Sequence, residues 1–380
     1  MAGAPGVKVQ YIGAACILVE HKGAKVLCDP WLSDRAYYGS WTHPQPLSVS
    51  LNDFDDIDFI YISHIYPDHL DVATLMELPR VPILIASYPD MMLKQLLMDF
   101  KLNVLEVSAF ALGEDFLVGI QAVDDIDSFA VFHGGDKVLL NTNDCLPLTS
   151  QRIDFLDHVD FHCVGYAGAG PWPQCFDNYD DEEKKKLAGV KASMFLQASR
   201  AAVKKSKARY YMPFAGEYVL QGKFSKLNRF RGIPYIKDVN LGPNTVRLKR
   251  MDWWNLETEQ VEHSYAHQEV SVPVVGRLYD YEHDEEPEIT EEFWDGVVNK
   301  WLTSLKNQGQ ELQQTIKING MELGRGDSLL EITLDERLLW RLLNKQAHWK
   351  GAEIGSHLTF NRTPDIFDRG LHRRFSNFHI

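Results

Sequence analysis

The sequence predicts an α/β protein, built as a four-layer αββα sandwich and followed by a small C-terminal α+β module. Strand patterns come in meandering groups with helices between them, which suits two mixed sheets packed together better than a regular βαβ repeat. One buried strand runs directly into a loop rich in histidine and aspartate. An acidic, polar stretch at residues 283–287 indicates a linker, so we expect one domain over residues 1–284 and an accessory module over residues 285–380.

The individual elements follow from the spacing of the apolar residues. Apolar runs and alternating patterns predict strands at residues 9–20 (strand, turn, strand), 25–30, 58–63, 81–86, 103–108, 116–123, 128–133, 137–141 and 209–213. Helical spacing predicts helices at residues 70–78, 90–100 and 182–207. In the C-terminal module, helices at 291–305 and 335–344 flank short strands at 314–318 and 328–332.

Composition sets the broad class of the protein. Hydrophobic residues make up 45% and charged residues 24%, as in ordinary globular proteins. No run approaches the ~20 apolar residues of a membrane helix, and the N-terminus shows no secretory signal, so we expect a cytoplasmic protein without a membrane partner. The net charge of −14 argues against binding to nucleic acid. The five cysteines lack paired spacing, and we expect buried thiols.

The segment SHIYPDHLD, residues 63–71, carries the strongest chemical signal. It directly follows a buried strand, so its backbone is anchored while its side chains can converge on a metal. The pattern His-x-His-x-Asp-His is how metallo-β-lactamase-fold proteins supply ligands to two metals, and here Tyr66 stands in place of the second histidine. We expect His64, Asp68 and His69 to be metal ligands. Tyr66 and Asp68 are the expected catalytic residues.

Acidic residues later in the chain extend this ligand set. Asp144 follows a strand after a predicted hairpin, where an aspartate that bridges two metals is expected. Asp124 falls where lactamase-fold relatives hold a histidine, and Asp125 and Asp127 are near enough to compete for the same role. The alternative for these acids is a solvated loop. Glu217, at the end of a late strand, is the expected last ligand, with a salt bridge as its alternative.

Aromatic residues near the predicted metal centre are candidates for binding a substrate. Trp31, Tyr38 and Trp41 lie in or beside the loop at residues 33–50, which could cover an apolar or ring-bearing molecule. Trp172 follows a glycine-rich run and could shape a pocket wall. Loops packed without substrate contact are the alternative. In the tail, Asp–Arg pairs are expected to tie the C-terminal module to the main domain, with a lid over the substrate as the alternative.

Several segments resemble the lactamase-fold part of the CMP-N-acetylneuraminate hydroxylases. These are HIYPDHLDVATL (64–75), KVLLNTNDC (137–145), YAGAGPWP (166–173), YYMPFAGEY (210–218) and EIGSHLTFNRTPDIFDRGLHRRF (353–375). That family also has an N-terminal Rieske domain with paired Cys-x-His motifs, which this sequence does not contain. The resemblance therefore implies the fold and a metal centre, but we do not carry over the sialic-acid activity. A looser resemblance, in ligand type alone, is to lactamase-fold diiron oxygenases of antibiotic biosynthesis.

The ligand types point to a class of reaction. Replacing imidazoles by carboxylates favours harder metals such as iron or manganese over zinc. We therefore expect two metal ions, with iron favoured and manganese or zinc as alternatives, and a non-haem iron oxygenase that uses O2 on a small-molecule substrate. Such an enzyme also needs an electron donor as a partner. A metal-dependent hydrolase of an ester, lactone or phosphodiester is the first alternative. A metal-free binding module is the second.

Overall fold

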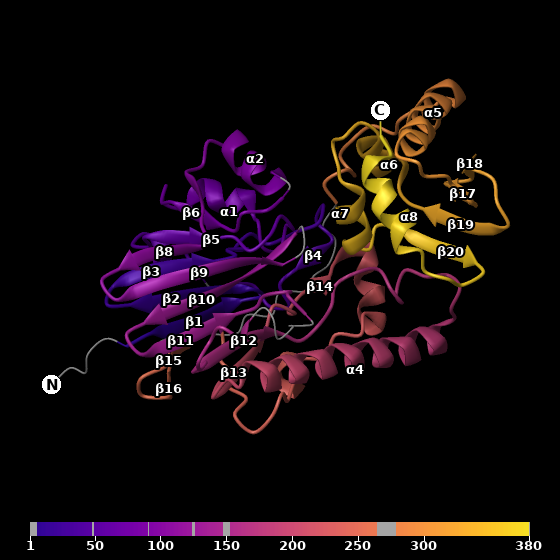
Figure 1. The fold of residues 1–380 in the computed structure, drawn as a ribbon. Coiled ribbons are helices and arrows are strands. Elements are labelled where there is room, and N and C mark those ends of the chain that lie inside the picture. The colour runs from indigo at the N-terminus through magenta and orange to yellow at the C-terminus, as the bar shows by residue number, and fades with distance from the viewer. Residues whose placement is uncertain are drawn as a thin grey trace.

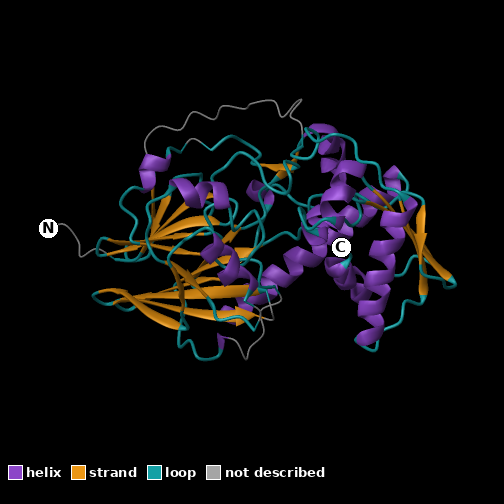
Figure 2. Ribbon diagram, turned by 90° about the horizontal axis from the view of Figure 1, so that it is seen from above, coloured by secondary structure: helices purple, strands orange, loops and turns teal. Residues whose placement is uncertain are grey.

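The computed structural model describes residues 6–47, 49–89, 91–123, 126–146, 153–263 and 279–379. Two β-sheets stacked face to face form the larger part of the molecule (Figures 1 and 2). The first sheet has eight strands in the order β16-β15-β1-β2-β3-β5-β6-β7. Their bounds are β1 (Lys8–Gly13), β2 (Cys16–His21), β3 (Ala24–Cys28), β5 (Phe59–Tyr61), β6 (Ile83–Ile85), β7 (Val104–Glu106), β15 (Trp253–Asn255) and β16 (Gln260–Glu262). Neighbouring strands from β3 to β7 are parallel, and the other pairs are antiparallel.

The second sheet has six strands in the order β13-β12-β11-β10-β9-β8. Their bounds are β8 (Ala109–Gly113), β9 (Phe116–Val123), β10 (Asp127–Gly134), β11 (Lys137–Asn141), β12 (Phe161–Gly165) and β13 (Tyr210–Phe214). The strands β11, β12 and β13 are parallel, whereas the hairpins from β8 to β11 are antiparallel. Gly135, with φ +61°, lies in the tight turn between β10 and β11, where a left-handed residue is needed.

Strand β10 shows how the sequence produces two buried faces. Ala130 and Phe132 pack in the core between the two sheets, while Phe129 and Val131 pack in a second core beneath the helix α4 (Asp181–Ser206). All four side chains are nearly inaccessible to water. Successive residues of a strand point to opposite faces, so a continuous apolar run is required where both faces are covered.

Helices cover the outer face of each sheet. The short helices α1 (Val72–Glu77) and α2 (Met92–Asp99) pack on the eight-stranded sheet, and α4 runs along β12 and β13 on the far side (Figure 1). The carboxylate of Asp180 caps the start of α4 by accepting a hydrogen bond from the amide of Glu183. Acidic residues in its first turn and lysines in its last turn complement the helix dipole. The predicted αββα sandwich is thereby confirmed.

The C-terminal part contains a small sheet with helices around it. The sheet order is β18-β17-β19-β20. The bounds are α5 (Glu291–Asn307), β17 (Gln314–Ile318), β18 (Met321–Leu323), β19 (Ser328–Thr333), α6 (Glu336–Leu343), α7 (Trp349–Ile354), β20 (Thr359–Thr363) and α8 (Arg369–Arg374). Its core contains Trp294 and Trp301 of α5, and it also takes in Phe176 and Tyr279 from earlier in the chain. A domain boundary at residue 285 stays a prediction, since this core draws on residues on both sides of it.

The structure contains elements that the sequence patterns did not reveal. The strand β12 holds His162 in its middle, which breaks the apolar signal. That imidazole is fully buried and bonded to the hydroxyls of Thr142 and Ser206, and burial lowers its pKa to about 3. Within the loop expected at residues 33–50, the short strand β4 (Trp41–Thr42) pairs with β14 (Val219–Leu220). All five cysteines are buried, as predicted. Among the described residues, no helix combines the length and apolar character needed to cross a bilayer.

The packing of β10 makes a testable prediction about stability. Replacing Phe132 by Ala should lower the free energy of unfolding by roughly 3–5 kcal/mol, because it leaves a cavity between the two sheets. Leu117, on the neighbouring strand β9, is 52% exposed, so Leu117→Ala should change it by less than about 0.5 kcal/mol. Urea unfolding of the two variants would measure both values. Equal losses would contradict the proposed core.

Candidate metal centre

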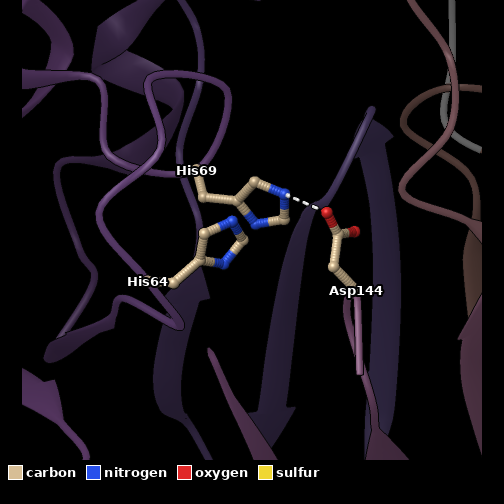
Figure 3. Close-up of side chains that lie close together, drawn as sticks. All are labelled: His64, His69 and Asp144. Carbon is tan, nitrogen blue, oxygen red and sulfur yellow. Dashed lines mark ion pairs between the residues drawn. The ribbon is translucent and has the colours of Figure 1, made fainter. Parts of the chain in front are cut away.

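The two sheets bring two histidines and an aspartate together at one edge of the sandwich. His64 and His69 come from the loop after β5, in the eight-stranded sheet, and Asp144 follows β11, in the six-stranded sheet. One nitrogen of each imidazole and one carboxylate oxygen of Asp144 all lie within 4.8 Å of one another. Figure 3 shows the two rings side by side, with His69 pointing toward Asp144. The sequence segments at 64–69 and 144 thus meet in space, as the motif predicted.

The orientation of His69 is set from behind by Asp29, the residue after strand β3. Its carboxylate oxygen Oδ2 lies 2.8 Å from Nδ1 of His69. Its two oxygens also accept hydrogen bonds from the backbone amide of Ser63, at 2.7 Å, and from the Ser63 hydroxyl, at 2.6 Å. Because a carboxylate only accepts hydrogen bonds, Nδ1 of His69 carries a proton. The other nitrogen, Nε2, is left to face Asp68 and Asp144, at 3.7 and 3.8 Å.

The same hydroxyl decides the tautomer of His64. The single proton of the Ser63 hydroxyl goes to Asp29, so its oxygen Oγ accepts from Nδ1 of His64 at 2.9 Å. Nε2 of His64 therefore carries a lone pair. That atom is buried and meets no hydrogen-bond partner in the part of the chain that the structure describes. A buried imidazole nitrogen with a free lone pair fits a metal ligand, since an unpaired buried polar atom is otherwise costly.

Asp68 is held by a tyrosine from another loop. The hydroxyl of Tyr37 donates to Oδ1 of Asp68 at 2.6 Å, while Oδ2 of the same carboxylate faces Nε2 of His69. Burial and the neighbouring Asp68 raise the pKa of Tyr37 well above its usual value, so its hydroxyl stays a donor. One oxygen of Asp68 is thus tied down, and the other is directed at the cluster.

The charges in this cluster favour a bound cation. Burial alone would lower the pKa of His69, but Asp68, Asp29 and Asp144 outweigh it and raise that pKa to about 10. Burial, together with Asp68 and Asp127, raises the pKa of Asp144 to about 7 against the opposing effect of His69. The Asp144 side chain keeps 36% of its surface exposed, so it is the most open member of the group. His69 and Asp144 thus hold extra protons that a metal ion would replace.

The other acids and the tyrosine of the predicted site occupy distinct places. Asp127 starts β10, and its Oδ1 lies 3.4 Å from Nδ1 of His64. Asp124 and Asp125 lie outside the described residues. The ring of Tyr66 stands edge-on to His64, with 5.1 Å between the ring centres. Burial and the carboxylates around it raise the pKa of Tyr66 to about 12.

A cavity opens beside the cluster. Asp68, His69 and Asp144 line it on one side, and Trp31 and Trp41 on another. Trp31 stacks on His43 and Trp41 stacks on Tyr218, so both indoles are held rigidly. Trp31 and Trp41, which the sequence suggested as substrate contacts, therefore line the cavity beside the cluster.

Other predicted residues do not join the cluster. Glu217 lines the same cavity, but its Oε2 accepts a hydrogen bond from Tyr11 and lies 3.6 Å from Arg250, so its carboxylate is engaged there. Tyr38 points to the C-terminal unit, the part of the chain that contains α5 to α8 and β17 to β20, where its hydroxyl accepts a hydrogen bond from the amide of His348. Trp172 packs against the C-terminal core. Neither Tyr38 nor Trp172 lines the cavity beside the histidines.

The roles that three residues play in the site were not found from the sequence. Asp29 and Ser63 each stand at the end of a predicted strand, and this position was the only signal of their role. Tyr37 lies in a loop whose path no local pattern predicts. Asp29 has φ +43°, a left-handed conformation that is rare for residues with a side chain and that functional sites often hold.

The chain is similar to one domain family and to a group of curated proteins. Residues 8–171 match the model of the beta-lactamase superfamily domain. The cytidine monophosphate-N-acetylneuraminic acid hydroxylase of Cricetulus griseus is 26% identical over 261 residues, covering 64% of this chain and 45% of the relative. That of Asterias rubens is 28% identical over 229 residues, covering 56% of this chain and 35% of the relative. The chain thus spans less than half the length of these curated relatives.

Two solved structures are similar to this chain at low identity. CmlA, a diiron β-hydroxylase from Streptomyces venezuelae, is 16% identical, with a TM-score of 0.43, over 65% of this chain and 53% of its own. A possible metal-dependent hydrolase from Veillonella parvula is 13% identical, with a TM-score of 0.48, over 65% of this chain and 98% of its own.

The charge balance makes a prediction for the metal-free protein. The pKa of His69 is raised to about 10, above its unfolded value, so its contribution to stability is complete below about pH 6.5 and is lost as the pH rises through 10. The pKa of Asp144 is also raised, to about 7, so its contribution to stability is likewise lost as the pH rises, through about 7. In the presence of a chelator, the free energy of unfolding should fall between pH 7 and 10, by up to about 1.4 kcal/mol per pH unit for one proton.

The Asp29→Asn variant tests the cause of that slope. It removes one of the charges that hold the extra proton on His69, so the slope should flatten. Asp136→Asn, at an exposed hairpin position, is the matched control and should keep the wild-type slope. Urea unfolding at several pH values measures this. A wild-type slope that is flat or rises over this range would show that His69 holds no extra proton.

Proposed function

We propose that this chain, of which residues 8–171 match the model of the beta-lactamase superfamily domain, is a metal-dependent oxygenase. It would bind two metal ions at the cluster of His64, His69 and Asp144, with iron preferred over manganese or zinc. It would insert one atom of O2 into a C–H or N–H bond of a small-molecule substrate.

One observation carries this proposal: the cluster is rich in acids and poor in imidazoles. Four aspartates lie within 4 Å of only two histidines: Asp29, Asp68 and Asp144 near His69, and Asp127 near His64. Tyr66 occupies the motif position where a third imidazole would stand. Carboxylate and phenol oxygens favour harder ions and higher oxidation states, whereas hydrolytic zinc sites rely on imidazole or thiolate.

The names of the curated relatives support the same choice. They are hydroxylases, and the likeness extends well past the lactamase-type domain, over 64% of this chain in the case of Cricetulus griseus. Identity is low and less than half of each relative is covered, so we propose the class of reaction without its sialic-acid substrate.

The residues of this chain would each take a defined part. His64 and His69 would offer their Nε2 lone pairs, Asp68 its free oxygen Oδ2, and Asp144 a carboxylate open to the cavity. Asp29 would keep His69 oriented and raise its basicity as a ligand. When bound, the iron ions would supply the oxidising chemistry with O2.

The overall balance requires a second partner. Hydroxylation of a C–H bond consumes O2, two electrons and two protons, and yields the alcohol and one water. We therefore propose an electron donor, either a small reductant or a redox protein. Trp31 and Trp41 would hold the substrate against the open side of the cluster and keep bulk water away from it.

Metal analysis tests the proposal most directly. Protein produced with iron should retain iron and consume O2 in the presence of a reductant such as ascorbate, and His69→Ala and Asp144→Ala should lose both metal and oxygen uptake. His158→Ala is the control, since this exposed histidine lies on the surface at Asp160, and it should behave as wild type. Zinc retained in place of iron, with hydrolysis of ester or phosphodiester substrates, would replace the oxygenase proposal by a hydrolase. Retention of no metal would refute it.

Tyr66 makes a separate spectroscopic prediction. If its phenol is an iron ligand, the ferric protein should show a visible iron–phenolate absorption band, and Tyr66→Phe should abolish it. The high pKa of Tyr66 means that only a strong Lewis acid would deprotonate it near neutral pH. A band that survives unchanged in Tyr66→Phe would show that this tyrosine is not a ligand. Metal content measured on the same samples separates loss of the ligand from loss of the metal.

A further inference from the structure

The loop that carries Tyr37 has a backbone that cannot hold its shape alone. Tyr37 and Tyr38 have φ of +49° and +57°, and Gly39 follows with +86°. Glycine adopts this left-handed region freely, but a tyrosine there is strained, and here two tyrosines in succession adopt it. Such a conformation persists only where the surroundings determine it.

Much of the support comes from the C-terminal unit. Nε2 of His357 lies 2.8 Å from the backbone oxygen of Tyr37, which also accepts from Ser40 within the loop. The amide of His348 donates to the hydroxyl of Tyr38 at 2.7 Å. Gly355 approaches so closely that an added Cβ would lie 2.9 Å from Cβ of Tyr37. Ile354 of α7 completes the contact by packing in the aromatic cluster that contains Trp31 and Trp41.

His357 is itself held in one state. A carbonyl oxygen can only accept, so Nε2 of His357 carries the proton, and Nδ1 accepts from the hydroxyl of Tyr281 at 2.9 Å. Rings from both parts of the chain surround the imidazole, among them Tyr38, Phe224 and Tyr279. Burial lowers its pKa to about 4, so it stays neutral at physiological pH and keeps this donor.

The far end of the same tyrosine reaches the metal centre. The hydroxyl of Tyr37 fixes Oδ1 of Asp68, which leaves Oδ2 toward Nε2 of His69. A chain of contacts therefore runs from His357 through the backbone and side chain of Tyr37 to the carboxylate of Asp68.

We propose that the C-terminal unit sets the ligand geometry of the metal centre through this chain, with Tyr37 and His357 as positioning residues for Asp68. The proposal rests on the metal centre of the proposed function. The C-terminal unit thus becomes part of the site, although none of its described residues lines the cavity beside the histidines. Asp68 would keep one oxygen available to a cation only while the loop holds Tyr37 in its left-handed conformation.

Cobalt(II) titration of the whole chain tests the proposal, because the affinity and the ligand-field bands of Co2+ report ligand geometry without any substrate. Tyr37→Phe should weaken Co2+ binding by about 10–100-fold, as is usual for partners of metal ligands, and should shift the bands. His357→Leu should weaken binding in the same direction. His357→Gln, whose side-chain amide can donate to the same carbonyl, should restore most of the affinity. Trp301→Phe removes a part-buried hydrogen bond to the backbone oxygen of Arg374 in the C-terminal unit and should leave Co2+ binding unchanged.

A double-mutant cycle decides whether His357 acts through Tyr37. The variant with both Tyr37→Phe and His357→Leu should bind Co2+ as weakly as Tyr37→Phe alone, within about twofold. Losses that multiply, or a Tyr37→Phe protein with wild-type affinity and bands, would overturn the proposal. If His357→Leu does not fold, Tyr37→Phe and His357→Gln still decide the outcome. If the wild type binds no Co2+, or if His69→Ala binds Co2+ as tightly as the wild type, the proposed function is refuted together with this inference. If the wild type binds Co2+ through His69 and the Tyr37 and His357 variants bind it unchanged, only this inference is refuted.

Discussion

The carboxylate of Asp29 is the constraint on which the rest of the site depends. It stands at the end of β3, fully buried, and joins three groups of the neighbouring loop: the amide and hydroxyl of Ser63 and the imidazole of His69. Through Ser63 it also determines which nitrogen of His64 carries the proton. A single acid at a strand end thus aligns both histidines toward Asp144, which comes from the other sheet. Without that alignment, the edge would hold no convergent lone pairs.

Electrostatics explains why this edge needs a positive charge. Several carboxylates surround two imidazoles in a region that water reaches poorly, and the protons shift to compensate. A cation provides the same compensation and also engages the lone pair on Nε2 of His64. Our proposal of iron or manganese over zinc, and of oxygen chemistry over hydrolysis, rests on these acid-rich surroundings. On this proposal, the neighbours of the histidines would influence the choice of metal as much as the histidines themselves.

The sequence predicted the sandwich and the meeting of residues 64–69 with Asp144, and residues 8–171 match the model of the beta-lactamase superfamily domain. These features were accessible because strand periodicity and motif spacing are local. Strand β12 was missed because His162 interrupts its apolar run, and its partners Thr142 and Ser206 are distant in sequence. Tyr37 was missed because left-handed tyrosines are stabilised by tertiary contacts alone. Tyr38 and Trp172 were expected near the substrate but lie against the C-terminal core, because tertiary contacts that no local pattern reveals also determine their positions.

The shared core around α7 has a consequence for how this protein can evolve. Ile354 reaches into the aromatic cluster, and Phe176 and Tyr279 reach back into the C-terminal core, so neither part buries its apolar surface by itself. A deletion or recombination that separated the two parts would expose the apolar surface of each part to water. Recombination at the linker should therefore be selected against, and changes in the tail should be accompanied by compensating changes in the loop that carries Tyr37.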